Sequence, residues 1–429
     1  MRISTSMIYR QGVKWMNDHQ AGLAKAQAQI SSGRKLLKPS DDPTNSARLM
    51  DLHKQIKLNE QYGRNIIIAN GRQSVEEVAV QESTDILQRA RELTIQANNA
   101  ALTSENRQTI ALEVQQLREQ LLDTANARDA DGAYLFAGFK EQSQPFTKTA
   151  GGDAIYNGDQ GQRSLQIGPS RQVPVGDTGD SVFMLIRNGN GQFRTSLAAD
   201  NTGNGTITVG SIANPTEFQN DFMGGNYPYT IEFSVTAAPN DPTPSDLTDP
   251  PPPITKYRIL DASGTEVVPL TPLAADDSYQ GETISFNGIE VAVEGHPDDG
   301  DRFIIKPAEN QSIFKTLDNL INTLGNPDNT ASDVAVLTQG LNNALTDIDQ
   351  ALLNLNQVRG RIGSRMNALD TQEEVNQNLN LQLQNLQSDI GSTDIAEAAS
   401  RMSQELLALQ ASQQSFVKIQ NLSLFNHLR

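Results

Sequence analysis

The chain has 429 residues, no cysteine, and 51 acidic against 34 basic side chains, which gives a formal net charge of −17. This balance argues against nucleic acid or an anionic membrane as the main partner, because both attract a concentrated basic face. The absence of cysteine excludes disulfides, thiolate nucleophiles and cysteine-ligated zinc.

The amino-terminal part predicts long amphipathic helices. Apolar side chains fall on one face of the first helix at heptad-compatible spacing, at Val13, Met16, Leu23 and Ile30. The same kind of pattern resumes at Leu49 and continues to Leu121. A stretch that contains glycine and proline, SSGRKLLKPSDDPTNSA, separates these helices.

We interpret that stretch as a joint between two helices. Gly33 is predicted to end the first helix, since glycine adopts the left-handed conformation without steric cost. Asp42 is the expected N-cap of the next helix and Pro43 its first residue. An anion or metal site is the alternative, but Leu36 and Leu37 separate the lysines. These leucines are expected to pack against a neighbouring subunit, and the basic and acidic halves of the joint to form complementary edges between subunits.

The middle of the chain predicts a strand-rich insertion, because glycine, proline, asparagine and threonine rise and the apolar period drops to two. Alternation predicts a half-buried strand at Tyr229, Ile231, Phe233 and Val235. Asn287-Gly288 between two short apolar runs predicts a hairpin. The proline-rich run from Pro239 to Pro253 predicts an extended loop or linker.

The carboxy-terminal part predicts a sustained heptad seam. One side chain recurs every seventh residue, with a single polar member: Leu341, Ile348, Leu355, Ile362, Leu369, Asn376, Leu383 and Ile390. After a break at GSTD, with Asp394 as a candidate N-cap, a second heptad run follows at Ile395, Met402, Leu409 and Phe416.

These patterns predict an α+β fold in which the two ends of the chain form a discontinuous antiparallel bundle or coiled coil of long helices, with an inserted β-rich domain. The only comparable partner for either apolar stripe lies at the other end of the chain. We expect a terminal helical assembly domain at residues 1–40 and 390–429, a helical bundle domain at 41–150 and 310–389, and a β-rich outer domain at 151–309.

No catalytic, cofactor or metal motif stands out. The four histidines are scattered, and there is no nucleophile elbow, Walker loop or dinucleotide-binding glycine pattern. No stretch approaches the roughly 18 apolar residues that span a bilayer. We therefore expect neither an enzyme nor a cofactor or metal, no membrane or nucleic-acid partner, and no cleaved signal peptide.

The terminal heptads could be the core of a monomeric bundle or could be reserved for assembly. Burying the four apolar side chains of the last run would contribute about 6–12 kcal/mol. Ordering about thirty-five residues costs about 1 kcal/mol or more for each residue. We therefore favour assembly, with termini that are loosely ordered in the monomer. The candidate interface comprises Met16, Leu23, Ile30, Leu36, Leu37, Ile395, Met402, Leu409, Phe416 and Ile419.

Several segments resemble the flagellin superfamily: MRISTSMIY at the start, ISSGRKLLKPSDDP, DGAYLFAGF, and the ending STDIAEAASRMSQELLALQASQQSFVKIQNLSLFNHLR. Within it the chain is most similar to the hook-associated protein 3 family, the FlgL-type proteins of the hook–filament junction. KPSDDP is more typical of that family than of flagellin. The resemblance covers roughly residues 1–185 and 310–429, and the residues between match only loosely.

The resemblance implies an extracellular structural adaptor at the hook–filament junction of the bacterial flagellum, exported unfolded by the flagellar type III pathway. It implies as partners hook-associated protein 1, flagellin, copies of the chain in a ring, and a flagellar export chaperone. Two alternatives stay open: a flagellin-like filament subunit, and a surface adhesin or enzyme carried by the β insertion.

Overall fold

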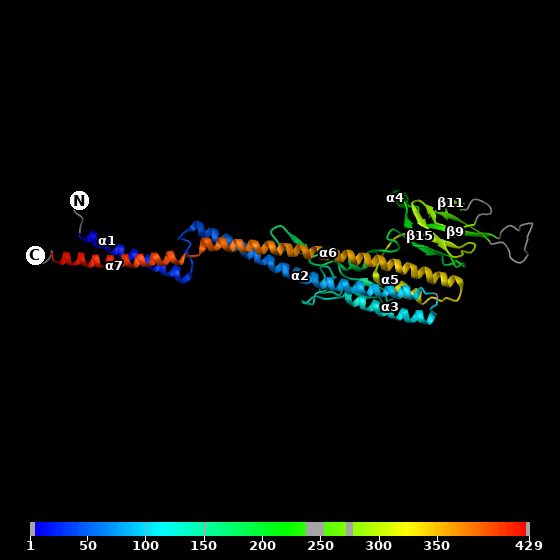
Figure 1. Ribbon diagram of the computed structural model, residues 1–429, viewed down its shortest axis with the longest axis horizontal. Helices are drawn as coiled ribbons and strands as arrows, with labels where there is room; N and C mark the ends of the chain where they lie inside the picture. The colour runs from blue at the N-terminus through cyan, green and yellow to red at the C-terminus, as the bar shows by residue number, and fades with distance from the viewer. Residues whose placement is uncertain (1–4, 100, 150–151, 237–252, 272–277, 426–429) are drawn as a thin grey trace, which may run out of the picture. The chain divides into compact units, whose positions relative to one another are not determined.

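The computed structural model describes residues 5–99, 101–149, 152–236, 253–271 and 278–425 (Figure 1). It divides into two compact units. The terminal unit comprises residues 1–67, 166–171 and 370–429, and the central unit comprises 68–165 and 172–369. The three-part division expected from the sequence stays a prediction.

Long helices stand at both ends of the chain and strands lie between them, which confirms the predicted fold class. The helices are α1 Thr5–Ser32, α2 Pro43–Ala97, α3 Ser104–Ala125, α4 Pro215–Gly224, α5 Ile313–Leu324, α6 Ala331–Gly391 and α7 Ile395–Phe425, with a π-helical turn, η1, at Asp180–Met184. Helices α2 and α6 each contribute residues to both units.

In the terminal unit α1 runs antiparallel beside α7 (Figure 1). The ring of Tyr9 near the start of α1 lies 4.9 Å from that of Phe416 near the end of α7. A second, small apolar contact joins the first part of α2 to the last part of α6, through Leu52, Ile56 and Leu383. The terminal unit is thus built from two helix pairs with little buried core.

The predicted heptad seam of α6 is confirmed. Leu341, Ile348, Leu355, Ile362 and Leu369 are at most 1% exposed. The first four belong to the main core of the central unit, which also takes residues from α2, α3 and α5. Helix α5 begins at the N-cap Ser312, whose side chain accepts the Lys315 N–H at 3.0 Å.

The strand-rich part of the central unit is built on a five-stranded sheet of order β11-β10-β9-β15-β6 and a three-stranded sheet of order β12-β13-β8. The strands are β1 Phe146–Lys148, β2 Ala154–Tyr156, β3 Ser164–Gln166, β4 Gln172–Pro174, β5 Ile186–Arg187, β6 Phe193–Leu197, β7 Thr206–Ile207, β8 Ser211–Ile212, β9 Tyr229–Thr236, β10 Ile254–Leu260, β11 Glu266–Thr271, β12 Ile284–Phe286, β13 Ile289–Val291, β14 Val293–Glu294, β15 Arg302–Pro307 and β16 Asn310–Gln311.

Two local predictions for this part are confirmed. Strand β9 buries Tyr229, Ile231 and Phe233 on one face, as its alternation predicts. Strands β12 and β13 pair as a hairpin whose turn residues Asn287 and Gly288 have φ of 45° and 78°. Most of the predicted proline-rich linker lies outside the described residues.

Candidate functional site

The terminal helix pair, α1 with α7, carries most of the predicted interface. His19 Nδ1 lies 2.7 Å from Glu405 Oε2. Gly12 allows close approach, because a Cβ added there would lie 3.1 Å from the Phe416 ring. One added at Gly22 would lie 2.9 Å from the Glu405 carboxylate.

The antiparallel register brings the two predicted stripes together. Tyr9 lies against Phe416, and the heptads run in opposite directions on the two helices. Met16 is therefore level with Leu409, and Leu23 with Met402.

The stripes are only partly covered by this pairing. Met16, Leu23, Ile30, Met402, Leu409 and Phe416 are all half-buried. Ile395 is 63% exposed, whereas the small Ala398 is fully buried. The Ile419 side chain lies outside the described part of the chain. Further apolar side chains of the pair are exposed, at Tyr9, Trp15, Leu406, Leu407 and Val417.

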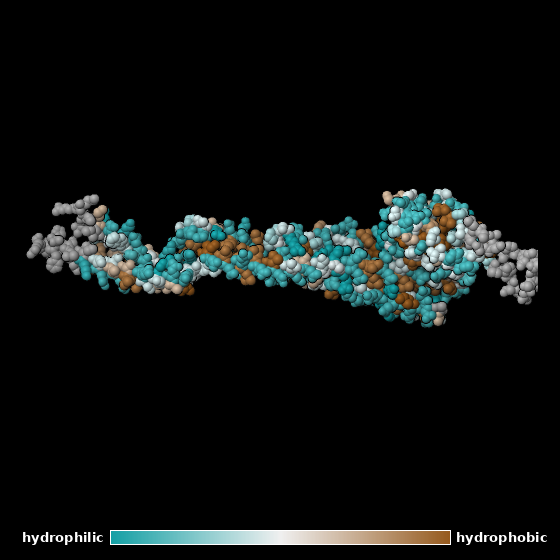
Figure 2. Space-filling view, turned by 45° about the horizontal axis from the view of Figure 1, so that its top comes forward, coloured by the Kyte–Doolittle hydropathy of each residue, from teal (hydrophilic) through white to brown (hydrophobic). Residues whose placement is uncertain are grey.

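Apolar surface also occurs on the second helix pair of the terminal unit, formed by α2 and α6 (Figure 2). Its exposed apolar side chains include Met50, Leu58, Ile67, Val375, Leu379, Leu381 and Leu386. Clusters of exposed apolar side chains of this kind are typical of surfaces that bind another protein.

The joint between α1 and α2 lies against the break between α6 and α7. Gly33 follows the last residue of α1 with φ +67°. Two backbone hydrogen bonds connect the joint and the break: the Lys35 N–H donates to the Gly391 carbonyl at 2.8 Å, and the Thr393 N–H donates to the Gly33 carbonyl at 3.0 Å. Gln29 Nε2 also donates to the Lys35 carbonyl at 2.6 Å. The left-handed glycine thus turns the chain so that both breaks are hydrogen-bonded to each other.

Both carboxylates of the joint are occupied within the chain. Asp41 Oδ1 lies 2.8 Å from Lys25 Nζ, and this contact lowers the pKa of Asp41. Asp42 Oδ1 accepts the Asn45 N–H at 3.0 Å, a capping bond that lowers the pKa of Asp42 at the start of α2. The acidic half of the joint thus has partners within the chain, and complementary edges between subunits stay a prediction.

The two leucines of the joint are half-buried. Leu36 lines a pocket of about 430 Å³ together with Leu49 and His53 of α2 and Gln387 of α6. For Leu36 and Leu37, packing against a neighbouring subunit stays a prediction.

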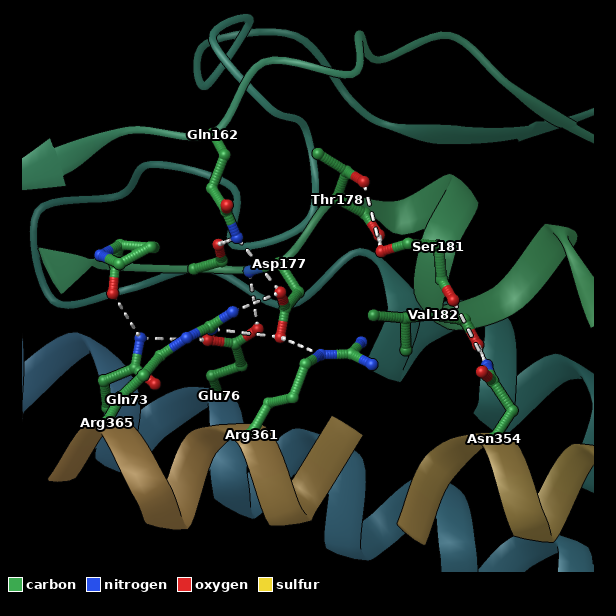
Figure 3. A network of polar contacts seen from close by, with 12 residues as sticks. Gln73, Glu76, Gln162, Asp177, Thr178, Ser181, Val182, Asn354, Arg361 and Arg365 are labelled. Atoms are coloured by element: carbon green, nitrogen blue, oxygen red, sulfur yellow. Dashed lines mark hydrogen bonds and ion pairs between the residues drawn. The ribbon is translucent and has the colours of Figure 1, made fainter. Parts of the chain in front are cut away.

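A buried polar network lies in the central unit (Figure 3). Asp177 follows β4, and its side chain is 5% exposed. Arg365 of α6 donates to both of its oxygens, at 2.8 and 3.1 Å. Gln162 Nε2 donates to Oδ1 at 3.1 Å, and Arg361 Nε lies 4.0 Å from Oδ2. The loop around Asp177 is thus bound tightly to α6.

Glu76 of α2 holds the same loop from the other side (Figure 3). Its side chain is 2% exposed, and Oε1 accepts the backbone N–H of Asp177 at 2.8 Å. Burial raises the pKa of Glu76 to about 7, and the nearby charge of Asp177 adds to the rise. Asn354 of α6 holds the next turn of this segment, η1, because its Nδ2 donates to the Val182 carbonyl at 2.9 Å.

No sequence pattern singled out Glu76 or Asp177.

The polar member of the heptad seam has a specific partner in the terminal unit. Asn376 is 4% exposed, and its Nδ2 donates to the Ile167 carbonyl at 2.9 Å. Asn59 Nδ2 of α2 donates to the backbone carbonyl of Asn376 at 2.6 Å. A buried amide needs such partners to offset its lost hydration.

Within the described ranges, no helix is long and apolar enough to cross a membrane. Among the same residues, no group of three or more His, Asp or Glu side chains could hold a metal ion.

Comparisons with known proteins place these helices in a family. The bacterial flagellin N-terminal helical region matches residues 3–141, and the bacterial flagellin C-terminal helical region matches residues 345–428. Flagellar hook-associated protein 3 of Escherichia coli is 34% identical over 186 residues, which are 43% of this chain and 58% of that protein. The chain thus spans a little over half the length of this curated relative.

Solved structures match more of the chain. The flagellar junction protein FlgL from Legionella pneumophila is 33% identical with a TM-score of 0.69, over 81% of this chain and 100% of that one. The chain belongs to the FlgL-type, hook-associated protein 3 family of the flagellin superfamily. FlgL from Xanthomonas campestris is 25% identical with a TM-score of 0.66, over 79% of this chain and 99% of that one. The resemblance predicted from the sequence is confirmed, and α1 and α7 lie in the regions that match flagellin helices.

Proposed function

We propose that this FlgL-type chain is a structural adaptor of the bacterial flagellum that joins the hook to the flagellin filament. Its mechanism is assembly through the terminal helix pair, and it catalyses no reaction. The observation that carries the proposal is the heptad seam of α1 and α7, which this pairing buries only in part. A helix pair that leaves its own seam partly exposed has apolar surface available for other subunits.

The proposed partners follow from the family and from this surface. Hook-associated protein 1 lies on the hook side, flagellin on the filament side, and copies of the chain form a ring between them. The exposed apolar side chains of the second helix pair give these copies a further contact. The chain works outside the cell after export through the flagellar type III pathway, and an export chaperone binds it in the cytoplasm.

A double substitution, Leu409→Asp with Phe416→Asp, tests the mechanism. Charges placed on the seam should prevent subunits from packing, since an unpaired carboxylate is costly to bury. The variant is expressed in a strain that lacks the native gene, and hooks and filaments are counted by electron microscopy. We expect hooks without filaments and flagellin in the medium, while the purified variant keeps the near-ultraviolet circular dichroism of its central unit.

The matched control is Phe222→Asp with Met223→Asp, which changes two exposed apolar side chains of α4, far along the chain from the terminal helices. These residues are 42% and 78% exposed. We expect normal filaments from this control. Filaments on the hooks of the Leu409, Phe416 variant would overturn the assembly mechanism.

A filament-subunit role is tested on the purified native chain by negative-stain microscopy. The adaptor role predicts no long filaments from the chain alone, and long filaments would favour the flagellin-like alternative.

A further inference from the structure

Glu76 is a buried carboxyl group that forms no ion pair with any residue that the structure describes. It is 2% exposed, and its one good hydrogen bond comes from the Asp177 N–H at 2.8 Å. Its second oxygen, Oε2, has only a long 3.5 Å contact with Gln73 Nε2. Across the part of the chain that the structure describes, no arginine or lysine forms an ion pair with Glu76. A carboxylate in such a place loses its hydration and gains little in return.

The cations that face Glu76 from the two helices are bound to other carboxylates. From α6, Arg365 is bidentate on Asp177, and Arg361 approaches the same side chain at 4.0 Å. From α2 itself, Arg72 Nη2 lies 2.9 Å from Glu141 and Nη1 lies 3.3 Å from Asp129. The backbone N–H of Asp177 donates to Glu76 Oε1, while the Asp177 carboxylate is a nearby negative charge that raises the pKa of Glu76 (Figure 3). An ionised Glu76 would therefore face the like charge of Asp177. The positive charges of Arg365 and Arg72 and the Asp177 N–H favour the ionised form, but burial and the charge of Asp177 outweigh them.

A buried acceptor lies next to Glu76 for the proton of its neutral form. Gln73 Oε1 is buried and accepts no hydrogen bond from any described group. Gln73 already contacts Glu76 Oε2 through its amide. A rotation of that amide, which gives up its long 3.4 Å contact with the Pro174 carbonyl, would let a protonated Oε2 donate to Gln73 Oε1. A neutral Glu76 then donates one hydrogen bond and accepts another.

We propose that Glu76, Asp177 and Arg365 form a proton-dependent latch, which holds the loop before η1 onto α2 and α6 while Glu76 carries a proton and loosens when that proton is lost. The loop connects β4 to η1, and η1 is packed into the main core through Val182 and Phe183. The latch therefore controls how firmly the start of the strand-rich insertion is held on the helices.

The sign of the pH effect on loop opening follows from the pKa of Glu76 in the closed and the open loop. Closing the latch raises this pKa from the ordinary 4.5 to about 7. The closed state therefore binds more protons, and the stabilisation is complete below pH 4.5 and is lost as the pH rises through about 7. Between about pH 6 and about pH 8 the opening equilibrium should increase about tenfold.

Hydrogen exchange on the full native chain tests the latch, because the Asp177 N–H that Glu76 accepts is a direct reporter of opening. Exchange of the peptide containing residues 172–184 is measured by mass spectrometry across this pH range and corrected for intrinsic rates. We expect opening to rise about tenfold in the native chain. In Glu76→Gln, which keeps an acceptor for the Asp177 N–H but cannot titrate, opening should not change with pH.

Glu77→Gln is the matched control. It makes the same chemical change one residue along α2, at a partly exposed side chain that pairs with Arg359 at 2.9 Å. The tenfold rise should persist in this control. An equal pH dependence in native chain and Glu76→Gln, or none in the native chain, would overturn the latch.

Infrared titration of the native chain needs no variant. A carboxylic-acid carbonyl band should disappear near pH 7, where exposed carboxyl groups are already ionised. Absence of such a band at pH 6 would also overturn the proposal.

Discussion

Replacing Arg365 by methionine should destabilise the central unit strongly. In the folded chain the guanidinium makes two parallel hydrogen bonds to Asp177, and the two side chains are 14% and 5% exposed. Methionine fills similar space but leaves the Asp177 carboxylate with Gln162 as a neutral donor and with Arg361 at 4.0 Å. Removing one partner of a buried ion pair costs about 3–5 kcal/mol, because the remaining charge stays buried without compensation.

Arg359→Met is the matched control on the same helix. Arg359 pairs with Glu77 at 2.9 Å, but the two side chains are 36% and 32% exposed. Solvent screens such a pair, so we expect a loss of less than about 1 kcal/mol. Since both substitutions exchange arginine for methionine inside α6, the change in helix propensity is the same.

Urea unfolding separates the effect by unit. The single tryptophan, Trp15, lies in α1 of the terminal unit, whereas most tyrosines lie in the central unit. For Arg365→Met the midpoint of the tyrosine circular dichroism should fall by about 1 M or more, at a slope of about 3 kcal/mol per M. The tryptophan midpoint should stay unchanged. Equal shifts in the two variants would refute the reasoning that burial sets the cost.

Three smaller predictions concern other positions. Asn376→Ala removes the donor to the buried Ile167 carbonyl, and urea unfolding of the terminal unit should show a loss of about 1–3 kcal/mol. Gly288→Ala should destabilise the strand-rich part by at least about 1–2 kcal/mol, the cost of a left-handed conformation for a residue with a Cβ, and its Cβ would also lie 2.4 Å from the Asn214 carbonyl oxygen. Its melting temperature should therefore fall, and an unchanged melting temperature would contradict this. Glu76→Gln should raise the unfolding free energy above pH 7 by up to about 3 kcal/mol, and the gain should vanish as the pH falls towards 4.5.

The sequence predicted the features that depend on local periodicity and turn chemistry. The heptads of α6 place Leu341, Ile348 and Leu355 in the core, and Asn287-Gly288 supplies the turn of a hairpin. In each case the residues that decide the structure lie within a few positions of one another, so their spacing is visible in a single sequence.

The latch could not be predicted because its partners are far apart in the chain. Glu76 accepts a hydrogen bond from a residue 101 positions away, and Arg365 binds one 188 positions away. Each lies among other charged side chains on a long helix, where a glutamate or an arginine is ordinary. The seam did mark Asn376 as its polar member. Its partner, the Ile167 carbonyl, lies far away in the sequence on a loop that packs against α6, so the sequence alone could not identify it.

The joint between α1 and α2 shows how the same residues can suggest an interface and be used within the chain. Asp41 binds Lys25, and Asp42 caps α2. Within the described structure Lys35 and Lys38 form no ion pair, and both are exposed. The charge that the joint presents to a neighbour is therefore basic. If a neighbouring subunit docks at the joint, as predicted from the sequence, acidic groups would suit this surface. Replacing Lys35 and Lys38 by glutamate should then weaken incorporation into flagella, as counted by electron microscopy of hooks and filaments. Unchanged incorporation would show that the joint acts within its own chain alone.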